Sequence, residues 1–359
     1  MAYEVDIHAV GEESKSGDAI AIRFGDLSDP TKQFVVVIDG GFQKSGEKLV
    51  ERIKNDYGTT YVDLVISTHP DADHVNGLSV VLENLNVGEL WMHTPWNIND
   101  EVKKMAEERD LNTLLGSNNK LRKSLQAAYD LEQLAIKKGV KIVEPFEGTS
   151  AFNNVIHVLG PTLDYYYELT GEFDTSSVSI ASIFGSIVEK IKETISERWD
   201  EDKLEDPAED AVSARNNSSV ITLLQMEKNF LFLGDSGVPA IEKAANYADS
   251  QGFDLARKIH YMHVPHHGSK RNLGPTILDR IVGKKVAKGE KINKTAFISA
   301  AVGHPKHPSK RVKNALLRRG VDVAETCGED HCYRSADVAT RPGWGPITYV
   351  EFADTYEEE

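Results

Sequence analysis

Residues 67–77 read "STHPDADHVNG" and gather strong metal-ligand side chains within six positions: His69, Asp71, Asp73 and His74. They follow the apolar run "DLVIS", which predicts a buried strand. On an extended chain His69 and Asp71 project to the same side, toward one ion, whereas Asp73 and His74 enter the next turn and reach a second. A helix start capped by an aspartate explains Asp73 alone. The stretch therefore predicts a site for two divalent ions at a strand end.

Two later stretches have the same form, a buried strand that ends in ligand side chains. "NFLFLGDSG" delivers Asp235, and a buried carboxylate is costly unless it is paired or bound to metal. "MHVPHHGS" delivers His266 and His267, of which His266, nearer the strand, is favoured as the ligand, with His267 behind it or against substrate. The predicted metal ligands are His69, Asp71, Asp73, His74, Asp235 and His266.

Strand and helix signals alternate along the chain and predict an α/β architecture in a single domain over residues 1–359. The last predicted strand is "ITYVEF", residues 347–352. Two insertions interrupt the pattern. Residues 99–139 are polar and helical, and residues 164–215 carry an amphipathic helix within "SIFGSIVEKIKETISERW" and then an acid-rich, solvent-facing tract.

Composition narrows the class of protein. No run approaches the roughly 18 apolar residues of a membrane span, and the N-terminus has no signal-like core, so we expect a cytoplasmic protein without a membrane partner. Cys327 and Cys332 form no disulfide framework, and their spacing around His331 is incidental.

Charge is distributed unevenly. The net charge is −15, yet residues 256–320 hold 16 Lys and Arg against two acids, Asp279 and Glu290, so this stretch alone is strongly basic. Such asymmetry favours an anionic partner at one face, and a solvated basic surface is the alternative.

Four motifs together resemble one known family. "THPDADHVNGL", "FLFLGDSG", "VPHHGSK" and "ISAAVGHPKHPS", in this order, are similar to the metallo-β-lactamase-fold hydrolases, closest to the soluble domain of the competence DNA-uptake (ComEC-like) branch. "SKSGDAIAIRFG" followed by "VVVIDGG" also matches that branch, so the resemblance runs from about residue 5 to 325. It implies an αββα sandwich with two mostly helical insertions, a metal site at the shared edge of its sheets, and hydrolytic activity.

The chain departs from the family pattern at two ligand positions. Asp71 stands where most of the wider family has a histidine, and no convincing histidine lies between the first cluster and Asp235; His157 belongs in a strand and His93 lies at the rim. The resulting oxygen-rich set predicts two divalent ions, Mn²⁺ or Zn²⁺ with Mg²⁺ as a further option, one held well and one labile.

A metal pair generates a hydroxide nucleophile at neutral pH, so the predicted activity is that of a metal-dependent hydrolase acting through a metal-bound hydroxide. Donors and cations near the ligands favour a phosphodiester, hence a phosphodiesterase or nuclease acting on DNA or RNA. The alternatives are a hydrolase of small esters or lactones and a non-catalytic binding module, and protein partners would dock on the insertions. The predicted catalytic residues are Asp73, His267 and His304, and the predicted substrate-binding residues are Ser269, Lys270, Asn217 and Ser219.

Overall fold

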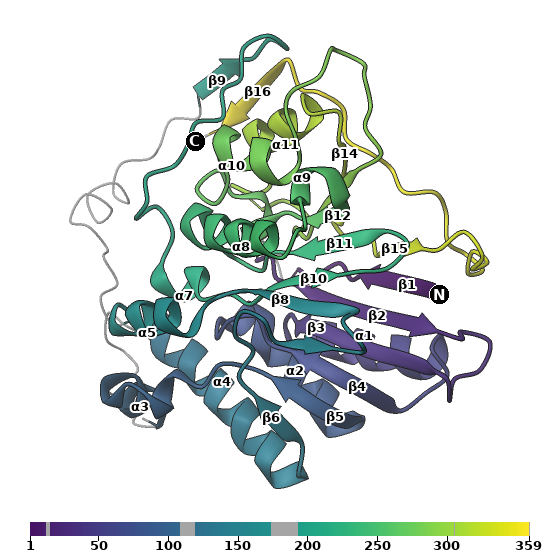
Figure 1. Ribbon diagram of the computed structural model, residues 1–359, viewed down its shortest axis with the longest axis vertical. Coiled ribbons are helices and arrows are strands. Elements are labelled where there is room, and N and C mark those ends of the chain that lie inside the picture. The colour runs from purple at the N-terminus through teal and green to yellow at the C-terminus, as the bar shows by residue number, and fades with distance from the viewer. Residues whose placement is uncertain (12–14, 108–118, 174–192, 305, 359) are drawn as a thin grey trace.

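The computed structural model describes residues 1–11, 15–107, 119–173, 193–304 and 306–358. Two seven-stranded sheets pack face to face, and helices cover the outer face of each (Figure 1). The predicted αββα sandwich is thus confirmed.

The N-terminal half of the chain forms most of the first sheet. Its parallel part is β3 to β6, and β15, β1 and β2 extend it with antiparallel pairing. The strand order is β15 (His331–Arg334), β1 (Ala2–Ile7), β2 (Ala19–Gly25), β3 (Gln33–Gly40), β4 (Tyr61–Ile66), β5 (Asn86–Trp91) and β6 (Lys141–Val143).

The second sheet mirrors this plan with the later strands. Its parallel part is β11 to β14, and β10, β8 and β7 pair antiparallel. The strand order is β14 (Asp322–Glu325), β13 (Thr295–Ile298), β12 (Ile259–His263), β11 (Asn229–Phe232), β10 (Ile221–Leu224), β8 (Ile156–Gly160) and β7 (Ser150–Ala151).

Helices form the two outer layers. The first sheet is covered by α1 (Gln43–Asn55), α2 (Ala72–Asn84) and α4 (Asn119–Lys138), and the second by α8 (Val238–Ser250), α9 (Leu255–Lys258), α10 (Pro275–Ile281) and α11 (Lys310–Leu317). Of the helices in the described part of the chain, none has the length and apolar content that crossing a bilayer requires.

Continuous apolar runs form the central strands because both faces of each sheet are buried. Val36 and Ile38 of β3 join the layer between the sheets together with Phe232 of β11. Val35 and Val37, on the opposite face, pack beneath α1 and α2. Alternate side chains of β3 therefore pack into two separate hydrophobic layers.

Three glycines bring the first two helices close to the end of β3. A Cβ atom on Gly77 of α2 would lie 1.9 Å from the Gly40 carbonyl oxygen, and one on Gly46 of α1 would lie 2.3 Å from the Gly77 carbonyl oxygen. Only a residue without a side chain allows this approach. It sets the first turn of α2 directly beside Asp39, at the end of β3.

The first predicted insertion contains α3 (Asp100–Glu107) and α4, linked to the sandwich through the 3-10 helix η1 (Pro95–Asn97). The described part of the second contains most of α5 (Leu163–Gly171), the strand β9 (Glu193–Ser196) and α7 (Ala214–Asn217). β9 pairs with β16 (Thr355–Glu358), so residues 193–196 are a strand and the predicted amphipathic helix is wrong there; residues 182–192 lie outside the described part.

The acid-rich tract mostly faces solvent as expected, since Glu201, Glu205 and Glu209 are exposed, while Asp202 pairs with Lys285 at 2.9 Å. One further expectation is corrected. Residues 347–352 form no strand; Phe352 instead packs on Trp199, with ring centroids 5.2 Å apart.

Candidate metal centre

The predicted ligands converge where the parallel strands of both sheets end. His69 follows β4, and α2 begins at Ala72, so Asp73 and His74 lie in its first turn. Asp235 follows β11, and His267 lies in the 3-10 helix η3 (Pro265–Gly268) after β12. The carboxyl ends of parallel strands share one edge, which explains how segments far apart in sequence meet.

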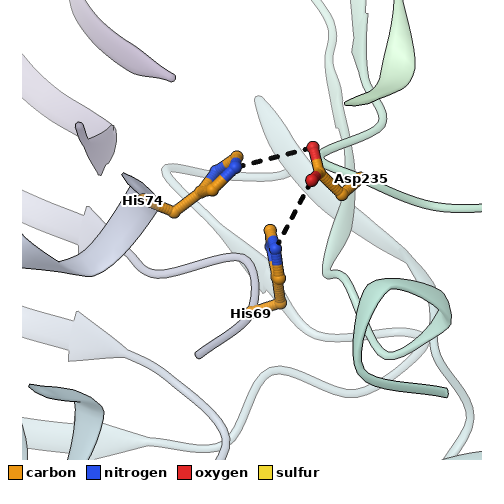
Figure 2. Close-up of side chains that lie close together, drawn as sticks. All are labelled: His69, His74 and Asp235. Atoms are coloured by element: carbon orange, nitrogen blue, oxygen red, sulfur yellow. Dashed lines mark ion pairs between the residues drawn. The ribbon is translucent and has the colours of Figure 1, made fainter. Parts of the chain in front are cut away.

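His69, His74 and Asp235 form the centre of this cluster (Figure 2). Nε2 of His74 lies 3.5 Å from one carboxylate oxygen of Asp235, and Nε2 of His69 lies 3.7 Å from the other. All three side chains are buried. These separations exceed the usual hydrogen-bond length, and they suit two ligands about 2.1 Å from a shared ion.

Asp39 and Thr68 fix the direction of both imidazoles. Nδ1–H of His74 donates to the Asp39 carboxylate at 2.8 Å. The Thr68 hydroxyl also donates to Asp39, at 2.6 Å, so its oxygen accepts from Nδ1–H of His69 at 3.0 Å. Each ring therefore carries its proton on Nδ1 and turns the lone pair of Nε2 toward Asp235, the orientation that metal-binding histidines adopt.

Asp73, His74 and His267 form a second group of potential ligands. Nε2 of His267 lies 3.9 Å from the Asp73 carboxylate, and its Nδ1–H donates to the Ser299 carbonyl oxygen at 3.0 Å. His266 and His267 both have positive φ, 49° and 56°. This backbone turn points both rings back toward the cluster.

His266 and His267 both face the cluster, from different depths. His267 is buried and shares a ligand group with Asp73, whereas the side chain of His266 is 35% exposed at the rim. Nε2 of His266 still faces Asp235 at 3.7 Å, and its Nδ1–H donates to Asn272 at 3.0 Å.

Asp71 is the predicted ligand that the structure directs elsewhere. Its carboxylate pairs with the guanidinium of Arg215, and it belongs to none of the ligand groups found among the described residues. Arg215 lies on α7, next to Asn216, whose amide approaches Asp235 at 3.4 Å.

Burial and mutual charge perturb the acid–base properties of the cluster. Burial raises the pKa of Asp235, whereas the neighbouring His266 and His74 imidazoles lower it. The imidazoles have the larger combined effect, so this pKa lies well below its usual value. Burial would lower the pKa of His74, but Asp235 and Asp39 raise it well above the usual value. Burial and His74 lower the pKa of His69 to about 3. The site thus requires one positive charge between His74 and Asp235, from a proton or a metal ion.

The donor atoms fit a divalent ion. Several face the cluster, are fully buried and lack a hydrogen-bond partner among the described residues: Nε2 of His69, His74 and His267, and one oxygen of Asp235. Such atoms are costly unless something binds them. Asp71 pairs with Arg215, and His267 joins the potential metal ligands. The donor set therefore contains more nitrogen atoms than the sequence predicted.

The predicted substrate-binding residues mostly bind backbone N–H groups of the loops that carry the metal ligands. The Ser219 hydroxyl accepts the backbone N–H of Asp235 at 3.1 Å, and the Asn217 side chain accepts from Gly237 at 3.0 Å. Ser269 accepts the backbone N–H of Arg271 at 3.2 Å. Their polar atoms hold these loops in place beside the metal ligands.

His304 and Lys270 lie in the loops next to the histidine cluster. Nδ1 of His304 accepts the backbone N–H groups of Lys306 and His307, at 3.1 and 2.9 Å. Its proton is therefore on Nε2, which makes the ring a hydrogen-bond donor there. His307 stacks on His304, with centroids 4.7 Å apart, and lies 5.7 Å from His266. Lys270 is half-buried one residue beyond Ser269.

Sequence reasoning missed several residues of the site. Asp39 was signalled by its place at the end of "VVVIDGG", where it resembles Asp235 after its strand. Asp18 pairs with His263 at 3.0 Å behind the cluster, and only the "SGDA" motif hinted at it. Arg215 had no signal of its own in the sequence. His93 packs between Phe146 and Tyr166, and His157 lies in β8, so neither contributes a ligand.

Several cations of the basic stretch pair with carboxylates. Arg318 pairs with Glu197, and Lys285 pairs with Asp202 at 2.9 Å, so the acid-rich tract of the second insertion docks on it. Arg319 pairs with Asp279 at 2.6 Å.

No protein-family model matches the chain, and no curated protein matches its sequence. Solved structures with similarity include a candidate metallo-beta-lactamase from Thermotoga maritima, with 12% identity, a TM-score of 0.35, and coverage of 70% of this chain and 93% of that one. A diphosphatase of the PhnP family has 10% identity, a TM-score of 0.38, and coverage of 93% and 98%. A mutant CmlA beta-hydroxylase has 10% identity, a TM-score of 0.43, and coverage of 92% and 54%. These values are too low for any conclusion about activity.

Proposed function

We propose that the chain is a metal-dependent hydrolase and that its preferred substrates are phosphodiesters, with DNA or RNA as the leading class. The observation that carries the proposal is the set of buried imidazole lone pairs and carboxylate oxygens that face one another 3.5 to 3.9 Å apart at the shared edge of the two sheets. A set of this kind is rare without an ion to bind it.

Each residue has a role that its contacts support. His74 would hold one ion, either with Asp73 and His267 or with His69 and Asp235, and His266 offers a further nitrogen ligand. When bound, a divalent ion lowers the pKa of a water and stabilises the negative charge that develops during hydrolysis. The nitrogen-rich set suits Zn²⁺ and still admits Mn²⁺.

Residues around the ligands would bind the substrate. The carboxylate of Asp73, 26% exposed, would accept a proton from an attacking water. Nε2–H of His304 is a donor for a substrate oxygen, and Arg271, which is exposed, adds positive charge in the same loop as His267. An anionic ester matches a donor and a cation better than a neutral lactone does.

A hydrolase of small esters or lactones is the second candidate. The internal pairing of the basic stretch favours it, because Arg318 and Lys285 already meet carboxylates and do not attract a polyanion. The two candidates differ in salt dependence, since contacts to nucleic-acid phosphates weaken steeply as salt rises and contacts to a neutral ester do not.

The test compares substrates and metals with a matched pair of variants. Purified protein is assayed with single- and double-stranded DNA, RNA, a generic phosphodiester and a lactone, each with Mn²⁺, Zn²⁺ or Mg²⁺. Asp73→Ala is expected to lower kcat about 100-fold or more. Asp164→Ala, an exposed first-turn aspartate of α5, serves as the control and should match the parent.

The outcomes separate the candidates. Turnover of the lactone alone, insensitive to salt, replaces the phosphodiester proposal with the second candidate. Absence of turnover with every metal indicates a non-catalytic binding module. An Asp73→Ala variant as active as the parent overturns the assignment of the site.

A further inference from the structure

The two groups of metal ligands compete for a single nitrogen atom. His69 and Asp235 form one group with His74, and Asp73 and His267 form the other with the same His74. Nδ1 of His74 is engaged by Asp39 at 2.8 Å, so only Nε2 remains for an ion. One lone pair binds one ion. A first ion that takes Nε2 of His74 therefore leaves any second ion without that ligand.

A second ion would have to use the other side of Asp235. Nε2 of His69 and Nε2 of His266 each lie 3.7 Å from the same oxygen of that carboxylate. Asp71 stands two residues beyond His69 and would be the natural fourth ligand. Its carboxylate is instead bound to Arg215, in a pair whose side chains are only 15% and 7% exposed.

Arg215 is held firmly at this position. Its helix, α7, begins with a side-chain cap, in which the Ser213 hydroxyl accepts the backbone N–H of Asn216, and Asn216 in turn approaches Asp235. The Ser218 hydroxyl donates to the Arg215 carbonyl oxygen at 2.6 Å. The guanidinium thus places a permanent positive charge next to His69, where a second divalent ion would experience repulsion.

We propose that Arg215 restricts the centre to one tightly held divalent ion by binding Asp71, and that a second ion enters only when this pair opens. The inference rests on the proposed function for the presence of a metal. It assigns to Arg215 a positioning role that decides the number of ions, and it accounts for a carboxylate of the ligand motif that faces away from the cluster.

The test measures bound metal rather than turnover. Metal-free protein is dialysed against increasing Zn²⁺ or Mn²⁺, and bound equivalents are determined by elemental analysis. The parent should bind one equivalent tightly and a second at least about tenfold more weakly. Arg215→Met should tighten the second equivalent by about tenfold or more, because Asp71 is released and the positive charge is removed. Arg215→Met combined with Asp71→Asn should lose this gain.

Two variants serve as controls. Arg198→Met removes an exposed arginine that pairs with Asp200 and should bind metal as the parent does. Asp71→Asn alone should keep the first equivalent and weaken the second, and it tests the inference even where Arg215→Met does not fold. Circular dichroism of each metal-free variant establishes that it is folded.

The results distinguish this inference from the proposed function. Two equally tight ions in the parent, or a folded Arg215→Met variant with unchanged binding, overturn the role of Arg215 even if the protein hydrolyses phosphodiesters. The expected binding pattern without any hydrolysis supports the role of Arg215 and overturns the proposed activity. Failure of every variant and the parent to bind an ion overturns both.

Discussion

Asp39 shows how one residue orients a whole cluster. Its backbone adopts φ 54° at the end of β3, and its carboxylate accepts from the Thr68 backbone, the Thr68 hydroxyl and the His74 ring. Through these contacts it directs two imidazole lone pairs inward. The ligand motif supplies the nitrogens, and this carboxylate determines which nitrogen of each ring is available for metal.

Replacement of Asp39 by asparagine should weaken metal binding without unfolding the protein. Asparagine tolerates positive φ, but its NH₂ group would face Nδ1–H of His74, so the ring proton would move to Nε2. We expect a 10- to 100-fold loss of affinity for the first ion, measured by competition with a chromophoric chelator. Asp63→Asn, at a carboxylate that accepts the Val35 backbone N–H at 2.8 Å, is the control. Equal loss in both variants would contradict the role of Asp39.

His93 provides a pH dependence outside the metal centre. Its ring is buried between Phe146 and Tyr166, with both nitrogens unpartnered among the described residues, and burial lowers its pKa from 6.5 to about 3. Between these two values only the unfolded state binds the proton. Acidification below pH 6.5 therefore lowers the free energy of unfolding, by about 1.4 kcal/mol per pH unit at most.

His93→Phe should remove this dependence while keeping the aromatic contacts. Urea unfolding of metal-free parent and variant is measured at several pH values from about 7.5 to about 5. The variant should be at least as stable as the parent at neutral pH, and its advantage should grow as the pH falls. Parallel stability curves for the two proteins would show that His93 does not titrate as its burial requires.

At the level of elements, the contact between α2 and the end of β3 positions the first turn of the helix. Gly77→Ala would place a methyl group within 1.9 Å of the Gly40 carbonyl oxygen, a backbone atom that cannot move aside alone. We expect a loss of about 1–3 kcal/mol in the free energy of unfolding and weaker metal binding, because α2 shifts away from Asp39.

The matched control is Gly171→Ala, at the last residue of α5, where a Cβ atom meets nothing within 4 Å. This substitution should be neutral or slightly stabilising, since alanine favours helix more than glycine does. Denaturant unfolding and a metal titration of both variants check the pair. If Gly77→Ala retains parental affinity, the glycine contact does not position the ligands.

The strands and helices that the sequence could predict are those marked by a pattern of neighbouring residues. β2 and the core of β3 follow from apolar runs buried on both faces. β9 and β16 are short and polar, so they become strands only through their mutual pairing. Residues 347–352 alternate like a strand, and the Val350 N–H donates to the Val323 carbonyl oxygen of β14 at 2.8 Å, but the segment forms no strand and Phe352 packs on Trp199.

The residues of the site also differ in whether a local sequence pattern predicts them. His69, His74 and Asp235 were predicted because each directly follows or enters a recognisable element. The pairing of Asp71 with Arg215 joins residues 144 positions apart, and no local pattern announces it. The order of His266 and His267 depends on two positive φ angles, which histidine seldom adopts.

At the scale of the whole molecule, the metal centre connects the two sheets. His69 and His74 follow β4 of the first sheet, whereas Asp235 and His267 follow β11 and β12 of the second. Asp18, before β2, also reaches across to His263 of β12 at 3.0 Å. Elsewhere between the sheets the contacts are mainly apolar. An ion at the centre would therefore link both halves of the sandwich by directional bonds.

Metal binding should accordingly stabilise the folded molecule as one unit. The unfolded chain does not hold these ligands together, so an ion at about 100 times its dissociation constant adds about 2.7 kcal/mol to the free energy of unfolding. We expect the midpoint of thermal unfolding to rise by roughly 5 °C on addition of Zn²⁺ or Mn²⁺, with a single transition, and to return on chelation. Asp235→Asn removes a carboxylate that serves both sheets and should abolish the rise. A rise that persists in this variant would locate the stabilising ion elsewhere, and separate transitions would mean that the ion does not couple the two sheets.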